Sequence, residues 1–220
     1  MTLKSLPLSF WFELLSFLIA FFSIKRLRGS AFVFFVPFLF IVVSGEFMGA
    51  YMKHELHLGN GWLYNILSVI QFLFWGIFFA HFLRKDIYRQ WSLLLLACFI
   101  FYAVINMIFI QGFRNFNHYT LIVGAFLIIL QCCFYYYQLF IDIEDIQLFK
   151  SPMFWIVTGA FFFFLGTFFY FALYDHLRRI QIRNHSRIFN LIITNLNLFF
   201  YSCISIGLTL VSNKNKWKQR

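Results

Sequence analysis

The chain has 220 residues, of which 62% are hydrophobic and 12% are charged. This balance excludes a soluble domain, because a core of this size cannot hide so much apolar surface. The formal net charge of +10 does not indicate nucleic-acid binding, because the basic residues lie in short segments between apolar runs, where they can contact anionic lipid headgroups. We therefore expect one domain, residues 1–220, embedded in a lipid bilayer.

Seven apolar segments follow one another along the chain, each of about 20 residues, the length that a helix needs to cross a bilayer. They are residues 6–24, 31–52, 62–82, 91–111, 121–141, 153–174 and 188–211. The first is followed at once by Lys25, Arg26 and Arg28, which is typical of a stop-transfer segment and not of a signal peptide. The sequence thus predicts an all-α, polytopic bundle of seven transmembrane helices. Pro37, well inside the second segment, predicts a kink there.

The Lys and Arg residues predict an orientation. Most of them fall on one side of the predicted membrane, at 25–28, 84–89, 150 and in the tail 214–220. Because basic loops stay in the cytoplasm, we expect an outside N-terminus and a cytoplasmic C-terminus in the cell membrane. The Arg-rich loop 175–187 breaks this rule, since it would lie outside.

Polar residues recur at steps of three and four in four of the segments, so each set shares one helix face. A charge that faces lipid at mid-span costs about 2.5 to 3.5 kcal/mol on insertion scales, and we therefore expect these faces to turn inward. The sets are Ser9, Glu13, Ser16 and Ser23; Asn65, Ser68 and Gln71; Gln131, Tyr135 and Gln138; and Asn190, Thr194, Asn197, Tyr201 and Ser205.

Depth suggests where a ligand could bind. With the predicted orientation, two carboxyl groups and several amides fall in the outer half of their segments, and we expect Glu46 to open into a polar pocket there and to face Glu13. The predicted ligand-binding residues are Glu13, Glu46, Asn65, Asn106, Thr194 and Asn197. An alternative stays open, in which the same side chains only hold the helices together by hydrogen bonds.

Other motifs give weaker signals. His54 and His57 have a spacing that a metal site can use, with Glu46 or His118 as a further ligand, but interfacial loop histidines explain the pattern as well. We expect no metal, no other cofactor and no catalytic residue. The four cysteines fall inside apolar segments and predict small buried hydrophobic side chains. No lysine in 188–211 can form a retinal Schiff base.

Three features resemble a group of small bacterial seven-span integral membrane proteins whose activity is uncharacterised. They are WLYN at 62–65, the pattern formed by Pro152, Phe154, Trp155 and Gly159, and the Asn-rich start of the last segment. The resemblance implies a signalling role beside a sensor kinase, and it assigns no catalytic residue.

We therefore expect a receptor-like or sensory module that binds a small or lipidic ligand and passes the change to a membrane or kinase partner. A small proton-coupled transporter that uses Glu13 or Glu46, and an intramembrane lipid-modifying enzyme, are the alternatives.

Overall fold

The computed structural model describes residues 6–141, 147–173 and 185–218, and every regular element within these ranges is helical. Helices suit long apolar segments because they satisfy all backbone hydrogen bonds within one segment. The α-helices are α1 (Leu8–Phe22), α2 (Ile24–Leu27), α3 (Phe35–His54), α4 (Gly61–Phe82), α5 (Asp86–Ile105), α6 (His118–Ile141), α7 (Pro152–Ala172) and α9 (His185–Lys218). Short 3₁₀ turns cover Ala31–Phe34 and Leu148–Lys150, and a π-helical turn covers Asn106–Ile110.

Six helical segments are long and apolar enough to cross a membrane, which indicates a multi-pass membrane protein. The first predicted segment differs, because α1 has only 15 residues and gives way at Ser23 to the short helix α2. At 1.5 Å per residue α1 is about 22 Å long, less than the hydrocarbon thickness of about 30 Å. The coarse prediction of a helical membrane bundle is confirmed, and the count of seven crossings stays a prediction.

The kink predicted at Pro37 stays a prediction, and the helix changes its type just before this residue. Pro37 lies in the first turn of α3, directly after the 3₁₀ turn Ala31–Phe34, and the α-helix then continues without interruption to His54. A proline is tolerated in the first turn because its missing N–H has no helical partner there. Pro152 occupies the same kind of position at the start of α7.

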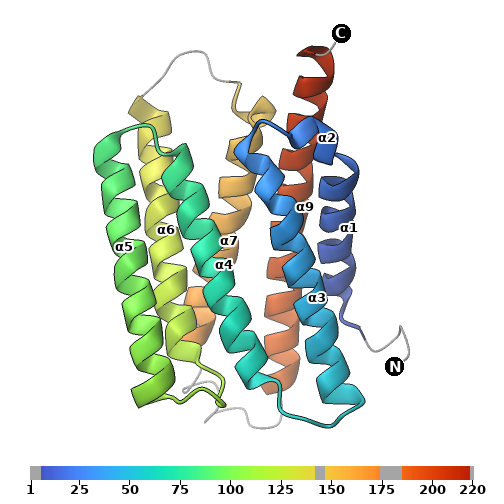
Figure 1. Ribbon diagram of the computed structural model, residues 1–220, viewed down its shortest axis with the longest axis vertical. Helices are drawn as coiled ribbons and strands as arrows, with labels where there is room; N and C mark the ends of the chain where they lie inside the picture. Colours follow the sequence, from blue (N-terminus) through green and yellow to red (C-terminus); the bar gives the residue numbers. More distant parts are fainter. Residues whose placement is uncertain (1–5, 142–146, 174–184, 219–220) are drawn as a thin grey trace.

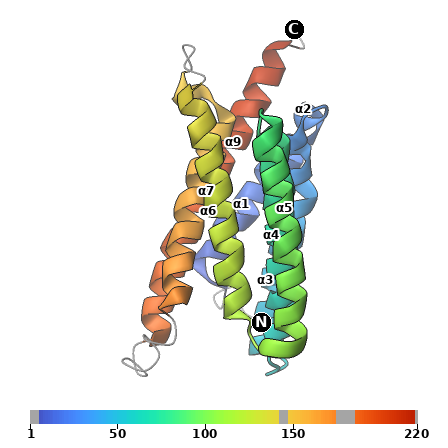
Figure 2. The ribbon, with the colours of Figure 1, turned by 90° about the vertical axis from the view of Figure 1, so that its left-hand side faces the viewer.

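The long helices form two layers. One layer contains α3, α4 and α5, and the other contains α1, α9, α7 and α6, so that α1 packs on α3 and α6 packs on α4 and α5. Figure 1 shows the helices roughly along the long axis, and Figure 2 shows α7 and α9 on the side opposite α4 and α5. Helix α1 begins at the end of the bundle opposite α2, and helix α9 ends at the α2 end (Figure 1).

Glycines let α9 approach α7 closely. A Cβ atom on Gly159 would lie 2.6 Å from Cβ of Cys203, and one on Gly166 would lie 2.7 Å from Leu196. No other side chain fits at such distances, so these glycines act as packing positions between membrane helices.

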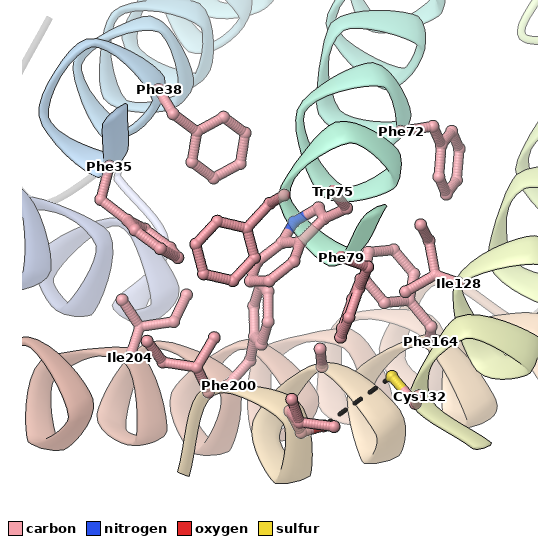
Figure 3. Close-up of a cluster of buried hydrophobic side chains, with 14 of the residues drawn as sticks. Phe35, Phe38, Phe72, Trp75, Phe79, Ile128, Cys132, Phe164, Phe200 and Ile204 are labelled. Carbon is pink, nitrogen blue, oxygen red and sulfur yellow. Dashed lines mark hydrogen bonds between the residues drawn. The ribbon is translucent and has the colours of Figure 1, made fainter. Parts of the chain in front are cut away.

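The core is aromatic, and it is concentrated in the half of the bundle that contains α2. Trp75 is fully buried and lies among rings from α3, α4 and α9 (Figure 3). In α4 only Asn65 is buried before Phe72, whereas most residues from 72 to 80 are buried. In α9 no residue from 191 to 199 is buried, and burial begins at Phe200. Along α4 and α9 the packing is therefore tight at the α2 end and looser at the opposite end, which we call the open end.

Candidate functional site

Glu13 is buried inside the bundle without a hydrogen-bonding partner for one of its oxygens. It lies on the face of α1 that also carries Ser9 and Ser16, as the spacing predicted, and only 3% of its surface is exposed. Its Oε2 atom is buried and makes no hydrogen bond within the described ranges. A buried carboxyl group with an unsatisfied oxygen is costly, so its position needs a reason.

Glu46 reaches the same region from α3, and it is half-buried. The Tyr64 hydroxyl, on α4, donates a hydrogen bond of 3.0 Å to Oε2 of Glu46. Gly49 makes room for this contact, because a Cβ atom at residue 49 would lie 2.7 Å from the Tyr64 hydroxyl oxygen. The small residue on α3 thus allows the tyrosine of α4 to reach the carboxylate.

The two carboxyl groups lie in the same region of the bundle, as the sequence predicted. Glu13 and Glu46 are close enough to interact electrostatically, and the hydroxyls of Tyr64 and Tyr201 interact with both. No Lys, Arg or His among the described residues forms an ion pair with either carboxyl group. We call Glu13, Glu46, Tyr64 and Tyr201 the carboxyl site. It lies between the two layers, where α1, α3, α4 and α9 meet.

A polar seam between α1 and α9 borders the carboxyl site. Ser16 Oγ lies 3.0 Å from the carbonyl oxygen of Tyr201 and 2.8 Å from Ser205 Oγ. The contact fixes the height of α1 against α9, and it places Glu13 one turn farther toward the open end than Ser16.

Asn65 has a different set of partners. Its Nδ2 donates to the carbonyl oxygens of Phe113 and Asn115, at 2.9 and 2.6 Å, and its Oδ1 accepts from the backbone N–H of Asn117 at 2.9 Å. The side chain therefore clamps the connection between α5 and α6 onto α4. Its amide is fully used by the protein itself.

Asn106 belongs to a neighbouring network. Its Nδ2 donates to Thr120 Oγ1 at 2.8 Å and to Gln111 Oε1 at 3.0 Å, whereas its buried Oδ1 has no partner among the described residues. Asn65 and Asn106 thus both hold the connection from α5 to α6, and neither hydrogen-bonds to the carboxyl site.

Thr194 and Asn197 are half-buried on α9. Asn197 precedes Tyr201 by four residues, so both lie on one helix face, and Asn197 lies one turn toward the open end. The structure therefore brings Glu13 and Glu46 together and places Asn65 and Asn106 in the connection from α5 to α6. Thr194 and Asn197 lie on α9, about two turns and one turn before Tyr201. Ligand binding by any of them stays a prediction.

Sequence reasoning missed Tyr64 as a member of the site. The signal was present, because Tyr64 lies four residues before Ser68 and therefore on the same helix face as Ser68 and Gln71. Tyr201 was predicted to face inward, and it is buried, but its meeting with Glu13 depends on how α9 packs on α1.

Among the described residues, no three His, Cys, Asp or Glu side chains come close enough to hold a metal. His54 and His57 are exposed, while His118 Nδ1 shares a hydrogen bond of 2.9 Å with Gln111 Nε2. The prediction that all cysteines are buried is half wrong. Cys132 and Cys203 are buried, but Cys98 and Cys133 lie on the outer surface of the bundle, where an apolar side chain can face lipid. The predicted loop 175–187 lies almost wholly outside the described residues.

Comparison of the chain with models of protein families, with curated proteins and with solved structures finds no match.

Proposed function

We propose that the protein crosses the cell membrane seven times, with its N-terminus outside and its C-terminus in the cytoplasm. The described basic side chains at 25–28, 84–89 and 150 gather at the α2 end of the bundle, whereas Lys53 and Arg114 lie at the opposite end. The rule that basic loops stay in the cytoplasm then makes the α2 end cytoplasmic. The carboxyl site falls in the outer half.

In that orientation the protein is a receptor-like module that binds a small or lipidic ligand at the carboxyl site. One observation carries the proposal: Glu13 is buried beside a second carboxyl group, and its Oε2 atom has no partner among the described residues. An ionisable side chain inside a membrane bundle is expensive and typically marks a functional site. A purely structural role describes Asn65 well, because its amide is satisfied on both sides, but it does not account for Glu13.

The packing supports binding from the outer side. The half of the bundle around Trp75 is filled by aromatic rings, whereas the polar rows on α4 and α9 near the carboxyl site are only half-buried. A ligand that enters from the outer side meets Asn197 and Tyr64 before it meets the aromatic core. Adjacent residues on α4 then connect the ligand to the surface, because Tyr64 contacts Glu46 and Asn65 clamps the connection that contains Asn115. A membrane-bound kinase is the kind of partner that the resemblance implies.

A proton-coupled transporter is the second candidate. It is favoured by the contact between two carboxyl groups that have no cationic partner among the described residues, because such a pair can hold and release a proton. Transport would also require the aromatic half around Trp75 and Phe200 to open, which ligand binding alone does not require.

The test is mass spectrometry of the small molecules released on denaturation of protein purified in a mild detergent. Wild type is compared with Glu13→Gln and Glu46→Gln, and with Glu55→Gln as a matched change at an exposed carboxylate beyond the end of α3. We expect a compound that wild type and Glu55→Gln carry and that both site variants lose. Equal content in all four proteins would contradict the proposal. Uptake into liposomes that follows a pH gradient and fails in Glu46→Gln would favour the transporter instead.

A further inference from the structure

The carboxyl site lacks the positive charge that would balance it. Two carboxyl groups approach each other within the bundle, and the only hydrogen bond made to either by a described side chain comes from the neutral hydroxyl of Tyr64. We propose that the site binds a small organic ammonium ion between Glu13 and Glu46. The inference rests on the proposed ligand-binding function and names the chemical class of the ligand.

Hydrogen bonding favours a cation with N–H groups. Oε2 of Glu13 is buried and has no partner within the described ranges, and Oε2 of Glu46 already accepts from Tyr64. An ammonium ion between the carboxylates donates to the free oxygens of both and leaves the tyrosine contact in place. Charge-assisted hydrogen bonds of this kind are about twice as strong as neutral ones.

The surroundings favour an organic ion over a metal ion. Phe10 and Phe17 lie one turn before and one turn after Glu13 on α1, and Tyr64 and Tyr201 reach the carboxyl groups from α4 and α9. Aromatic rings attract alkylammonium ions through cation–π contacts. Calcium, in contrast, takes about six to eight oxygen ligands, and the described residues offer no group of three acidic, His or Cys side chains.

The charge of the two carboxyl groups predicts that a proton is released when the ammonium ion binds. Without a cation, two carboxylates inside an apolar bundle cannot both stay ionised, so the pair holds a proton in the empty site. The groups that face the pair are the hydroxyls of Tyr64 from α4 and Tyr201 from α9, and a tyrosine side chain carries no positive charge. When one ammonium ion binds, it replaces one proton, and that proton is released to solvent. No covalent bond changes.

The experiment uses full-length protein in dodecyl maltoside, a detergent without an ammonium group. Butylammonium chloride is titrated while thermal stability and proton release are recorded, with sodium chloride at equal ionic strength and 1-butanol as controls. We expect saturable stabilisation by butylammonium with release of about one proton per bound ion, and no saturable effect of either control. Stabilisation by butylammonium no greater than that by sodium chloride would overturn the proposal.

Matched variants locate the effect. Glu13→Gln and Glu46→Gln should each weaken the apparent affinity for butylammonium at least about ten-fold, the equivalent of one charge-assisted hydrogen bond, and Glu55→Gln should bind as wild type does. Tyr64→Phe, which keeps both carboxyl groups, should bind more weakly by a smaller factor. An equal loss in Glu55→Gln would contradict the assignment to this site.

Two further measurements identify the source of the ammonium ion and show which of the two proposals fails. Short-chain phosphatidylethanolamine, whose headgroup carries a primary ammonium, identifies a lipid headgroup as the source if it competes with butylammonium, whereas its failure to compete identifies a soluble amine. Short-chain phosphatidylglycerol, which lacks the ammonium, serves as the control. A neutral or anionic molecule that depends on Glu13 in the mass-spectrometric test overturns the ammonium assignment alone. No bound molecule and no response to butylammonium would overturn both proposals.

Discussion

The Tyr64 hydroxyl donates a 3.0 Å hydrogen bond to Oε2 of Glu46 and thereby joins α4 to α3 near the buried carboxyl group of Glu13. The next residue, Asn65, holds the connection between α5 and α6 by three hydrogen bonds to its backbone. Two neighbouring residues of α4 thus connect the interior of the bundle with its end opposite α2. A change at the carboxyl site can therefore reach the connection between α5 and α6 through these two adjacent residues.

Tyr64→Phe should destabilise the protein. The change removes one hydrogen bond between helices and leaves the Glu46 oxygen without its donor, so we expect a loss of about 0.5 to 1.5 kcal/mol. Thermal unfolding in detergent measures it. Tyr51→Phe, at an exposed tyrosine of α3, is the matched control, and equal stability of the two variants would show that the Tyr64 contact contributes nothing.

Glu13→Gln should leave stability unchanged or raise it, by up to about 2 kcal/mol, because it removes a buried ionisable group whose Oε2 atom has no hydrogen-bond partner among the described residues. Thermal unfolding without added ligand measures the difference, and Glu55→Gln controls for the change of charge. A marked loss of stability in Glu13→Gln alone would support the alternative in which Glu13 only holds helices together.

Asn65→Ala should loosen the connection between α5 and α6 without moving α9. The backbone N–H of Asn117 loses its acceptor, so its hydrogen exchange should become faster by about ten-fold or more, as expected for a lost hydrogen bond of about 1 to 3 kcal/mol. Hydrogen exchange read by mass spectrometry measures the effect. Asn195→Ala is the control, because the Asn195 amide is exposed and bonds only to its own helix at Leu191. Equal exchange in both variants would contradict the clamp.

Gly159→Ala should separate α7 from α9. The added methyl would lie 2.6 Å from Cβ of Cys203 and 3.3 Å from the carbonyl oxygen of Phe200, and overpacking of this kind typically costs about 1 to 3 kcal/mol. Gly59→Ala meets no atom within 4 Å and should be neutral. Thermal unfolding of both variants is the measurement, and two equal melting temperatures would argue against close packing at Gly159.

The proposed topology predicts a labelling pattern in intact cells. Arg114→Cys should react with a membrane-impermeant maleimide, and Lys85→Cys should not, because the two positions lie at opposite ends of the bundle. Wild type is the control, since its four cysteines lie within α5, α6 and α9. A tag at the N-terminus should be accessible from outside the cell. If the tag is instead as inaccessible as residue 85, α1 does not cross the membrane.

The sequence by itself determined that the chain is a bundle of apolar membrane helices and which faces of α1 and α6 carry buried polar residues. The apolar runs 62–82 and 121–141 reappear almost unchanged as α4 and α6, and Ser9, Glu13, Gln131 and Gln138 are buried as their spacing predicted. Both results follow from local physics, because lipid requires internally bonded helices and penalises polar groups on the outer face.

Only the tertiary structure decided which polar side chains meet. Asn65 and Glu46 were predicted at a similar depth, yet the contact with Glu46 is made by Tyr64, while Asn65 turns to the backbone at Phe113 and Asn115. The rotation and height of each helix are set by side-chain packing between distant segments, such as Gly49 against Tyr64 and Ser16 against Tyr201. Those contacts join residues that lie 15 to 185 positions apart, and the periodicity within a single helix carries no information about them.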